Sequence, residues 1–283
     1  MQVARTIAQA RLAIGAARCA AKSVGCVPTM GALHEGHLSL IRRAREECGC
    51  VVVTIFVNPT QFPPGEDLDK YPRQEEQDLA LAEAEGVDLV FAPSVEEMYP
   101  SGCLTTVHVA ELTEVLCGPH RPGHFDGVAT VVAKLLSITT PERAYFGSKD
   151  YQQLLVIRRM VQDLNLPVEI IGCPTVREPD GLVLSSRNAY LSDEERRAAP
   201  ALHRALLAGT RVAKRGGTAA EVEEGVRAAL ASEPRFQLQY AEARRPDTLE
   251  RDDLPGPPMV IAVAAFLGST RLIDNVLVEK EPS

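Results

Sequence analysis

Tryptophan is absent from the chain, and phenylalanine and tyrosine supply only 5% of its 283 residues. A surface for single-stranded nucleic acid needs aromatic rings on which bases stack, so this sequence has little with which to build one. Acidic residues outnumber basic ones, 38 to 30, which gives a formal net charge of −8. Phosphate backbones and anionic lipids repel such a protein, so we expect neither a nucleic acid nor a membrane as a partner.

The sequence also lacks long apolar runs. No stretch reaches the roughly eighteen apolar residues that a membrane-spanning helix needs. The first 21 residues carry three arginines in an alanine-rich stretch, without the continuous apolar core of a secretion signal. The seven cysteines are odd in number and include no C-x-x-C pair. This favours buried free thiols in a reducing cytoplasm over disulfides or a zinc site.

Short apolar runs alternate with segments of helical spacing through the first two thirds of the chain. Five runs are predicted to be buried strands: Val24–Pro28, Val51–Val57, Val87–Phe91, Ala144–Phe146 and Val168–Gly172. Continuous apolar strands that alternate with helices are typical of a parallel sheet covered on both faces. We therefore predict an α/β fold whose ligands bind beyond the carboxyl ends of the strands.

The last third of the chain has a different pattern. Helices and strands are predicted at Ser192–Glu195, Val222–Leu230, Gln237–Tyr240 and Met259–Leu267. The first of these is a capping box, and Pro200 should interrupt the helix that it opens. We predict a larger domain over residues 1–175 and a smaller α+β domain over residues 176–283.

The first predicted strand runs into Pro28-Thr29-Met30-Gly31-Ala32-Leu33-His34-Glu35-Gly36-His37, after which a helix is expected. Glycines let the backbone approach a bulky ligand, and a helix N-terminus presents N–H groups to an anion. His34 and His37, three residues apart, can point the same way in a helical turn. The same spacing also fits a metal pair or a polar turn, but the strand-to-helix setting favours phosphate chemistry.

Polar residues also follow two other predicted strands. Asn58 and Gln61 suit hydroxyl and carboxylate oxygens, although Asn58, before a proline, is equally typical of a turn. Lys149 follows the fourth strand, where an ammonium can bind phosphate, and Gln153 lies one turn into the next helix. The alternative for Lys149 is a surface pair with Asp150 that caps this helix.

Two further segments contain groups that bind anions. Arg121 could clamp a phosphate or order a flap. Proline and glycine on either side of it are equally typical of a plain loop. Ser185-Ser186-Arg187 joins the two parts of the chain. Two hydroxyls and a guanidinium in succession form either a mobile anion clamp or a polar interdomain loop.

Six segments together resemble one family, the pantothenate synthetases (pantoate–β-alanine ligases). They occur in the order and at the spacing of that family: Pro28–His37, Phe56–Phe62, Tyr71–Arg73, Arg121–Phe125, Lys149–Gln153 and Leu184–Asn188. Each is weak alone, but six in register along essentially the whole chain are highly specific. With the strand pattern, the resemblance implies a Rossmann-like doubly wound parallel sheet and a second, smaller α+β C-terminal lid domain.

The resemblance implies an ATP-dependent reaction in two steps. ATP and pantoate would form an enzyme-bound pantoyl adenylate and pyrophosphate, and the amine of β-alanine would then displace AMP to give pantothenate. It also implies Mg²⁺, a cytoplasmic location and a homodimer. The chain would thus act in the biosynthesis of pantothenate and coenzyme A.

The family's functional residues carry over position by position. Four are expected to be catalytic and, with Mg²⁺, to supply positive charge at phosphorus: His34, His37, Lys149 and Arg187. Gln61 and Gln153 are expected to bind pantoate, Gln61 also to face β-alanine, and Asp78 to help hold the metal. The ATP site is expected to comprise Met30, Gly31, Ala32, Leu33, His34, Glu35, Gly36, His37, Gly147, Ser148, Lys149, Asp150, Val176, Leu184, Ser185, Ser186 and Arg187. Three positions depart from the family pattern and bear on substrate affinity: Thr60, Ser148 and Leu184.

Two other functions are open on the sequence. Another nucleotidyl transferase, such as a cytidylyltransferase or a synthetase-like enzyme acting on tRNA, would share the His-x-Gly-His motif, although the negative charge argues against RNA. A non-catalytic nucleotide-binding module would leave His37, Lys149 and Arg187 unexplained together. Pyrophosphate release that depends on pantoate distinguishes the three.

Overall fold

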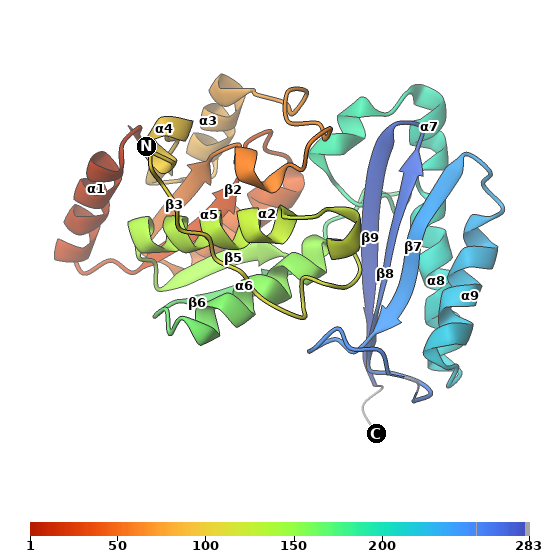
Figure 1. Cartoon of the computed structure of the whole chain (residues 1–283). Coiled ribbons are helices and arrows are strands. Elements are labelled where there is room, and N and C mark those ends of the chain that lie inside the picture. The colour runs from red at the N-terminus through yellow and green to blue at the C-terminus, as the bar shows by residue number, and fades with distance from the viewer. Residues whose placement is uncertain (253, 281–283) are drawn as a thin grey trace.

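The computed structural model describes residues 1–252 and 254–280. Its larger part is a six-stranded parallel sheet between helices, and its smaller part is a three-stranded antiparallel sheet with helices packed beside it (Figure 1). Within the described ranges, no helix combines the length and the apolar character that crossing a membrane requires.

The large sheet has the strand order β1-β4-β3-β2-β5-β6, with every neighbouring pair parallel. Its strands are β1 (Gln2–Ala4), β2 (Val24–Thr29), β3 (Cys50–Ile55), β4 (Leu89–Phe91), β5 (Arg143–Gly147) and β6 (Glu169–Cys173). All five predicted strands are present. The chain moves outward from β2 through β3 to one side and returns to β5 on the other. The crevice where this order reverses, between the carboxyl ends of β2 and β5, is where such sheets bind ligands.

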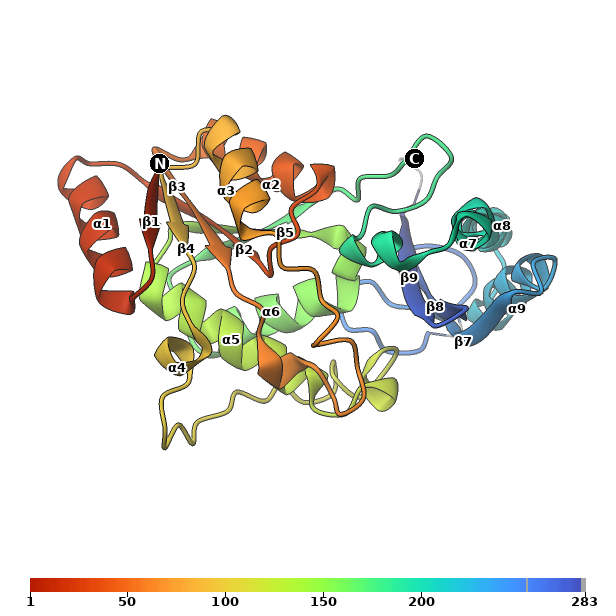
Figure 2. The ribbon, with the colours of Figure 1, turned by 90° about the horizontal axis from the view of Figure 1, so that it is seen from above.

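Helices cover both faces of this sheet (Figure 2). They are α1 (Ile7–Cys19), α2 (Glu35–Glu47), α3 (Glu75–Ala84), α4 (Val95–Met98), α5 (His124–Thr139) and α6 (Tyr151–Asp163). Apolar side chains of α1, α5 and α6 form one core with the sheet, and those of α2 and α3 form a second core on the opposite face. The predicted doubly wound sheet is confirmed.

The smaller part has its own apolar core. It consists of α7 (Asp193–Ala198), α8 (Ala201–Lys214), α9 (Ala219–Leu230), β7 (Phe236–Arg244), β8 (Met259–Leu267) and β9 (Thr270–Val278). Ser192 and Glu195 form the expected capping box, and Pro200 lies between α7 and α8. The predicted α+β character is confirmed, whereas the exact boundary at 175/176 stays a prediction.

Two strands were not predicted. β1 has three residues, of which two are exposed, so it carries almost no apolar signal. β9 contains Asp274 and Asn275, both buried, which break its apolar pattern. The seven cysteines are all free thiols, and only Cys19 and Cys103 are exposed.

Candidate active site

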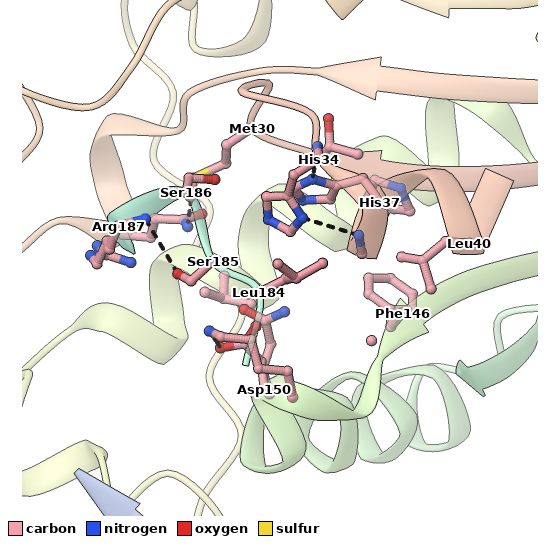
Figure 3. Close-up of a pocket in the computed structure, with 18 of the residues that line it drawn as sticks. Met30, His34, His37, Leu40, Phe146, Asp150, Leu184, Ser185, Ser186 and Arg187 are labelled. Atoms are coloured by element: carbon pink, nitrogen blue, oxygen red, sulfur yellow. Dashed lines mark hydrogen bonds and ion pairs between the residues drawn. The ribbon is translucent and has the colours of Figure 1, made fainter. Parts of the chain in front are cut away.

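The sequence motifs converge at the carboxyl ends of β2 and β5, on the two sides of the switch point. β2 leads into the turn that holds His34, and β5 leads into the turn that holds Lys149. A cavity of about 230 Å³ lies between these turns, and Ser185–Arg187 forms another part of its wall (Figure 3). A larger cavity of about 900 Å³ adjoins it, and Lys149 and Arg187 line both.

Backbone hydrogen bonds determine where the two motif imidazoles carry their protons. His34 is the N-cap of α2, and its Nδ1 accepts the N–H of Gly36 at 3.1 Å. Nδ1 of His37 accepts the backbone N–H of His34 at 3.4 Å, and the ring centroids lie 4.2 Å apart. Because both δ nitrogens act as acceptors, the proton of each neutral ring is assigned to Nε2. The turn therefore supplies two N–H donors side by side.

Neither imidazole is charged at neutral pH. Burial, with a smaller contribution from the charge of Lys149, lowers the pKa of His34 to about 4. Burial, together with smaller contributions from His34 and the charge of Lys149, lowers the pKa of His37 to about 3. The expectation that the two histidines supply positive charge is therefore wrong for this state. They supply oriented N–H dipoles instead.

Asp78 of α3 holds the loop that precedes His34. Its Oδ2 accepts the N–H of Ala32 at 2.9 Å, its Oδ1 accepts the N–H of Leu33 at 2.7 Å, and the residue is only 2% exposed. Gly31 has φ +80°, and a Cβ there would lie 2.8 Å from Oδ2. Asp78 is thus engaged with the loop backbone and lies outside the cavity wall. Its contact with magnesium stays a prediction.

Lys149 and Arg187, two of the cations that line the cavity, come from two short turns. Lys149 lies in η3 (Ser148–Asp150), and its Nζ is 3.4 Å from Oδ1 of Asp150, so the predicted pair exists but lines the cavity. Arg187 lies in η4 (Ser186–Tyr190) and makes two hydrogen bonds of 3.0 Å to the carboxylate of Asp67. The hydroxyls of Ser185 and Ser186 accompany it on the same segment (Figure 3).

Asn58 organises the η1 turn (Pro59–Gln61) that presents Gln61. It is 1% exposed, and its Nδ2 donates to Oε1 of Gln61 at 3.0 Å and to the carbonyl of Gly127 at 3.1 Å. A Cβ on Gly127 would lie 2.3 Å from the carbonyl oxygen of Thr60, so only glycine lets α5 approach this closely. The structure supports the turn interpretation of Asn58 and places Gln61 on the cavity wall.

Two adjacent glutamines of α6 have different surroundings. Gln152 is buried, and its amide accepts the N–H of Cys117 at 3.0 Å and donates to the carbonyls of Leu112 and Val115 at 2.8 and 2.7 Å. Gln153 lines the cavity, and its amide has no hydrogen-bond partner among residues 1–252 and 254–280. The amide of Gln153 is therefore available to a ligand.

His124 was not assigned a role from the sequence, although it lies within a motif segment. It is 6% exposed and lines the cavity, with Nδ1 2.7 Å from the carbonyl oxygen of Gln61 and Nε2 2.8 Å from a guanidinium nitrogen of Arg121. Burial, with the charge of Arg121 second, lowers its pKa to about 3. Arg121 in turn contacts Glu66 at 2.5 and 2.6 Å. Arg121 thus fastens residues 63–70 to α5.

Most residues of the predicted ATP site line the cavity, and five do not: Gly31, Ala32, Leu33, Glu35 and Ser148. The first three belong to the loop that Asp78 supports, and Glu35 is paired with Arg42. Several apolar wall residues were not predicted: Leu40, Phe62, Tyr71, Val131, Val132, Leu135 and Phe146. In the sequence, such residues cannot be told from core residues.

Comparison with known proteins places this geometry in context. The family model described as pantoate-beta-alanine ligase matches residues 2–277. The chain is 54% identical over 280 residues to a pantothenate synthetase from Moorella thermoacetica, with 99% of each chain covered. It is 55% identical over 282 residues to one from Roseiflexus castenholzii, with 99% of this chain and 100% of the relative covered.

Solved structures agree. The pantothenate synthetase of Thermus thermophilus superposes with a TM-score of 0.94 at 52% identity, over 99% of this chain and 100% of that one. A pantoate-beta-alanine ligase from Francisella tularensis, complexed with beta-gamma ATP and beta-alanine, superposes with a TM-score of 0.82 at 38% identity over the full length of both chains.

Proposed function

Because the chain belongs to the pantoate–β-alanine ligase family, we propose that it condenses pantoate with β-alanine at the cost of ATP, through a pantoyl adenylate that stays bound until the amine attacks. One observation carries the proposal. Two imidazole N–H donors, the cations Lys149 and Arg187 and the unpartnered amide of Gln153 line a single cavity at the switch point. ATP and β-alanine are the ligands named for the Francisella relative.

In the first step, a carboxylate oxygen of pantoate attacks the α-phosphorus of ATP. The new O–P bond forms as the bond from this phosphorus to the bridging oxygen breaks, and pyrophosphate leaves with that electron pair. The Nε2–H groups of His34 and His37 and the charges of Lys149 and Arg187 stabilise the negative charge that develops on the phosphate oxygens. Gln61 and Gln153 hold pantoate in line for this attack.

In the second step, the amine of β-alanine, after losing a proton, attacks the acyl carbon of the adenylate. The C–N bond forms, the C–O bond to the phosphate breaks, and AMP leaves with the electron pair. The nitrogen then gives up its extra proton to the solvent, which leaves the neutral amide of pantothenate. Water would destroy the mixed anhydride, so the intermediate must be covered. The apolar side chains of Val131, Val132 and Leu135 line the cavity and help to keep water from the intermediate.

The residues present fit a magnesium ion carried by the nucleotide. The described part of the chain contains no group of three or more His, Cys, Asp or Glu side chains that could hold a metal by themselves. Mg²⁺ is usually bound by one or two carboxylates together with substrate phosphates and water. Asp150, 43% exposed on the cavity wall, is the carboxylate placed to reach such an ion. When bound, the ion would neutralise charge on the triphosphate.

We also infer a homodimer in the cytoplasm. Both properties follow from the family resemblance, and the free thiols are consistent with a reducing compartment. Sedimentation equilibrium of the full chain tests the dimer, and fractionation of the source cells tests the location.

Pyrophosphate release tests the reaction directly. The protein is mixed with ATP and Mg²⁺, with or without pantoate, and β-alanine is withheld. We expect release only with pantoate, limited to about one turnover per site because the adenylate stays bound. Adding β-alanine should then restore turnover and yield AMP. Release without pantoate, or none with it, would refute the proposed substrate.

A further inference from the structure

β9 carries two consecutive buried polar residues, Asp274 and Asn275, which are 3% and 8% exposed. Their cross-strand partners on β8 are the apolar residues Val263 and Ala262. Aspartate and asparagine are disfavoured in strands, and burying their polar groups is costly unless they are hydrogen-bonded. The contacts of these two side chains therefore indicate why a strand contains them.

Asn275 reaches across to the turn that carries Lys149. Its Nδ2 donates to the carbonyl of Ser148 at 3.0 Å and to the carbonyl of Lys149 at 2.7 Å. β9 is an edge strand of its sheet and the one that faces the larger part of the molecule (Figure 1). One side-chain amide of the C-terminal part thus fixes the backbone from which the ammonium extends.

Asp274 holds the other phosphate-binding segment. Its two carboxylate oxygens accept hydrogen bonds of 2.7 and 2.8 Å from the guanidinium of Arg177. Arg177 also donates to the carbonyl of Gly181 at 3.1 Å and forms a β-bridge with Val183. This hairpin leads directly into Ser185–Arg187, so Asp274 fastens the base of that segment to β9.

We propose that Asp274 and Asn275 are positioning residues for the triphosphate of ATP. Asn275 sets the Lys149 turn, Asp274 sets the Ser185–Arg187 segment, and their adjacency on one strand keeps the two segments at a fixed separation. Asn275 acts through the carbonyls of Ser148 and Lys149, and Asp274 acts through the guanidinium of Arg177. The inference rests on the proposed roles of Lys149 and Arg187.

The first test replaces the Asn275 donor and follows each substrate separately. For Asn275→Ala we expect the KM for ATP in pantoate-dependent pyrophosphate release to rise about tenfold, because the two hydrogen bonds that place the Lys149 turn are lost. The KM for β-alanine should change by less than about twofold. Asp274→Asn, which removes the charge paired with Arg177, should shift the KM for ATP in the same direction. If the alanine variant does not fold, Asn275→Ser, whose hydroxyl is too short to reach both carbonyls, replaces it.

A matched control separates positioning from loss of packing. Val276 is the next residue on β9, and its apolar side chain packs against the C-terminal core. Val276→Ala should lower the melting temperature and leave the KM for ATP unchanged. An equal rise in that KM for Val276→Ala, or no rise for Asn275→Ala, would overturn the inference.

A double-mutant cycle with Lys149→Ala distinguishes failure of this inference from failure of the proposed function. If Asn275 acts through Lys149, adding Asn275→Ala to Lys149→Ala should weaken ATP binding by less than about threefold. If the double variant weakens ATP binding by the product of the two single-variant factors, the positioning role of Asn275 is refuted. A Lys149→Ala variant with unchanged ATP binding and activity refutes the proposed site itself.

Discussion

Replacing Gln153 with alanine should weaken pantoate binding and leave the fold as stable as before, because its amide has no hydrogen-bond partner in the described part of the protein. In the bound state we expect this amide to contact the carboxylate or a hydroxyl of pantoate. Hydrogen bonds to charged groups contribute about 1.5–3 kcal/mol, so the KM for pantoate should rise about tenfold to a hundredfold. The free energy of unfolding should change by less than about 0.5 kcal/mol.

The neighbouring Gln152 provides the matched control. It has the same side chain on the same helix, but its amide makes three hydrogen bonds to the backbone of residues 112–117. At about 1 kcal/mol for each bond, Gln152→Ala should cost about 3 kcal/mol of stability. Pyrophosphate release at varied pantoate gives the KM, and urea unfolding gives the stability. If Gln153→Ala leaves the KM unchanged, or destabilises as much as Gln152→Ala, the assignment of Gln153 to pantoate is refuted.

Three further perturbations test other parts of the site. His37→Ala and Lys149→Ala should each slow adenylate formation at least about a hundredfold, because each removes one donor that stabilises charge in the transition state. The circular dichroism of both variants should be unchanged. Near-normal rates in both variants would contradict the assignment of the site. In the folded protein the three cavity histidines have pKa values lowered to between about 3 and 4. As the pH falls through about 6.5, the histidines of the unfolded chain therefore bind protons that those of the folded protein do not, and the free energy of unfolding decreases. Between pH 7.5 and pH 5.5 the three histidines together should lower the free energy of unfolding by at most about 4 kcal/mol, which urea unfolding measures. An equal or higher free energy of unfolding at pH 5.5 would contradict their burial as neutral rings. Gly127→Ala would place a Cβ 2.3 Å from the carbonyl oxygen of Thr60. The substitution should therefore shift Gln61, raise the KM for pantoate and lower the melting temperature. An unchanged KM for pantoate would show that the η1 turn does not position this substrate.

The sheet was predictable because burial on both faces leaves a strong signal. β2 and β3 are apolar nearly throughout, and helices of amphipathic spacing separate the strands. The positions of His34, Lys149 and Arg187 were predictable for a related reason. Each follows a strand end or a junction between the two parts, and parallel strands bring their carboxyl ends to one edge.

Other features depend on contacts between distant residues, which a sequence does not display. Asn58 was ambiguous until Gly127, far along the chain, supplied its hydrogen-bond partner. The neutrality of His37 follows from burial that only the folded chain creates. β9 was missed because Asn275 contacts the larger part of the molecule and Asp274 pairs with Arg177 near the junction of the two parts, at the expense of strand propensity.

The bidentate bridge between Arg187 and Asp67 has a consequence for how a nucleotide enters. The guanidinium already has an anionic partner before any ligand arrives. On the proposed role of Arg187, ATP binding there is an ion exchange, in which a phosphate takes the place of the Asp67 carboxylate. The affinity for ATP then reflects how much more strongly Arg187 binds a phosphate than the Asp67 carboxylate. Glu66 stays paired with Arg121, so residues 63–70 keep their attachment to α5 when the Asp67 carboxylate is released.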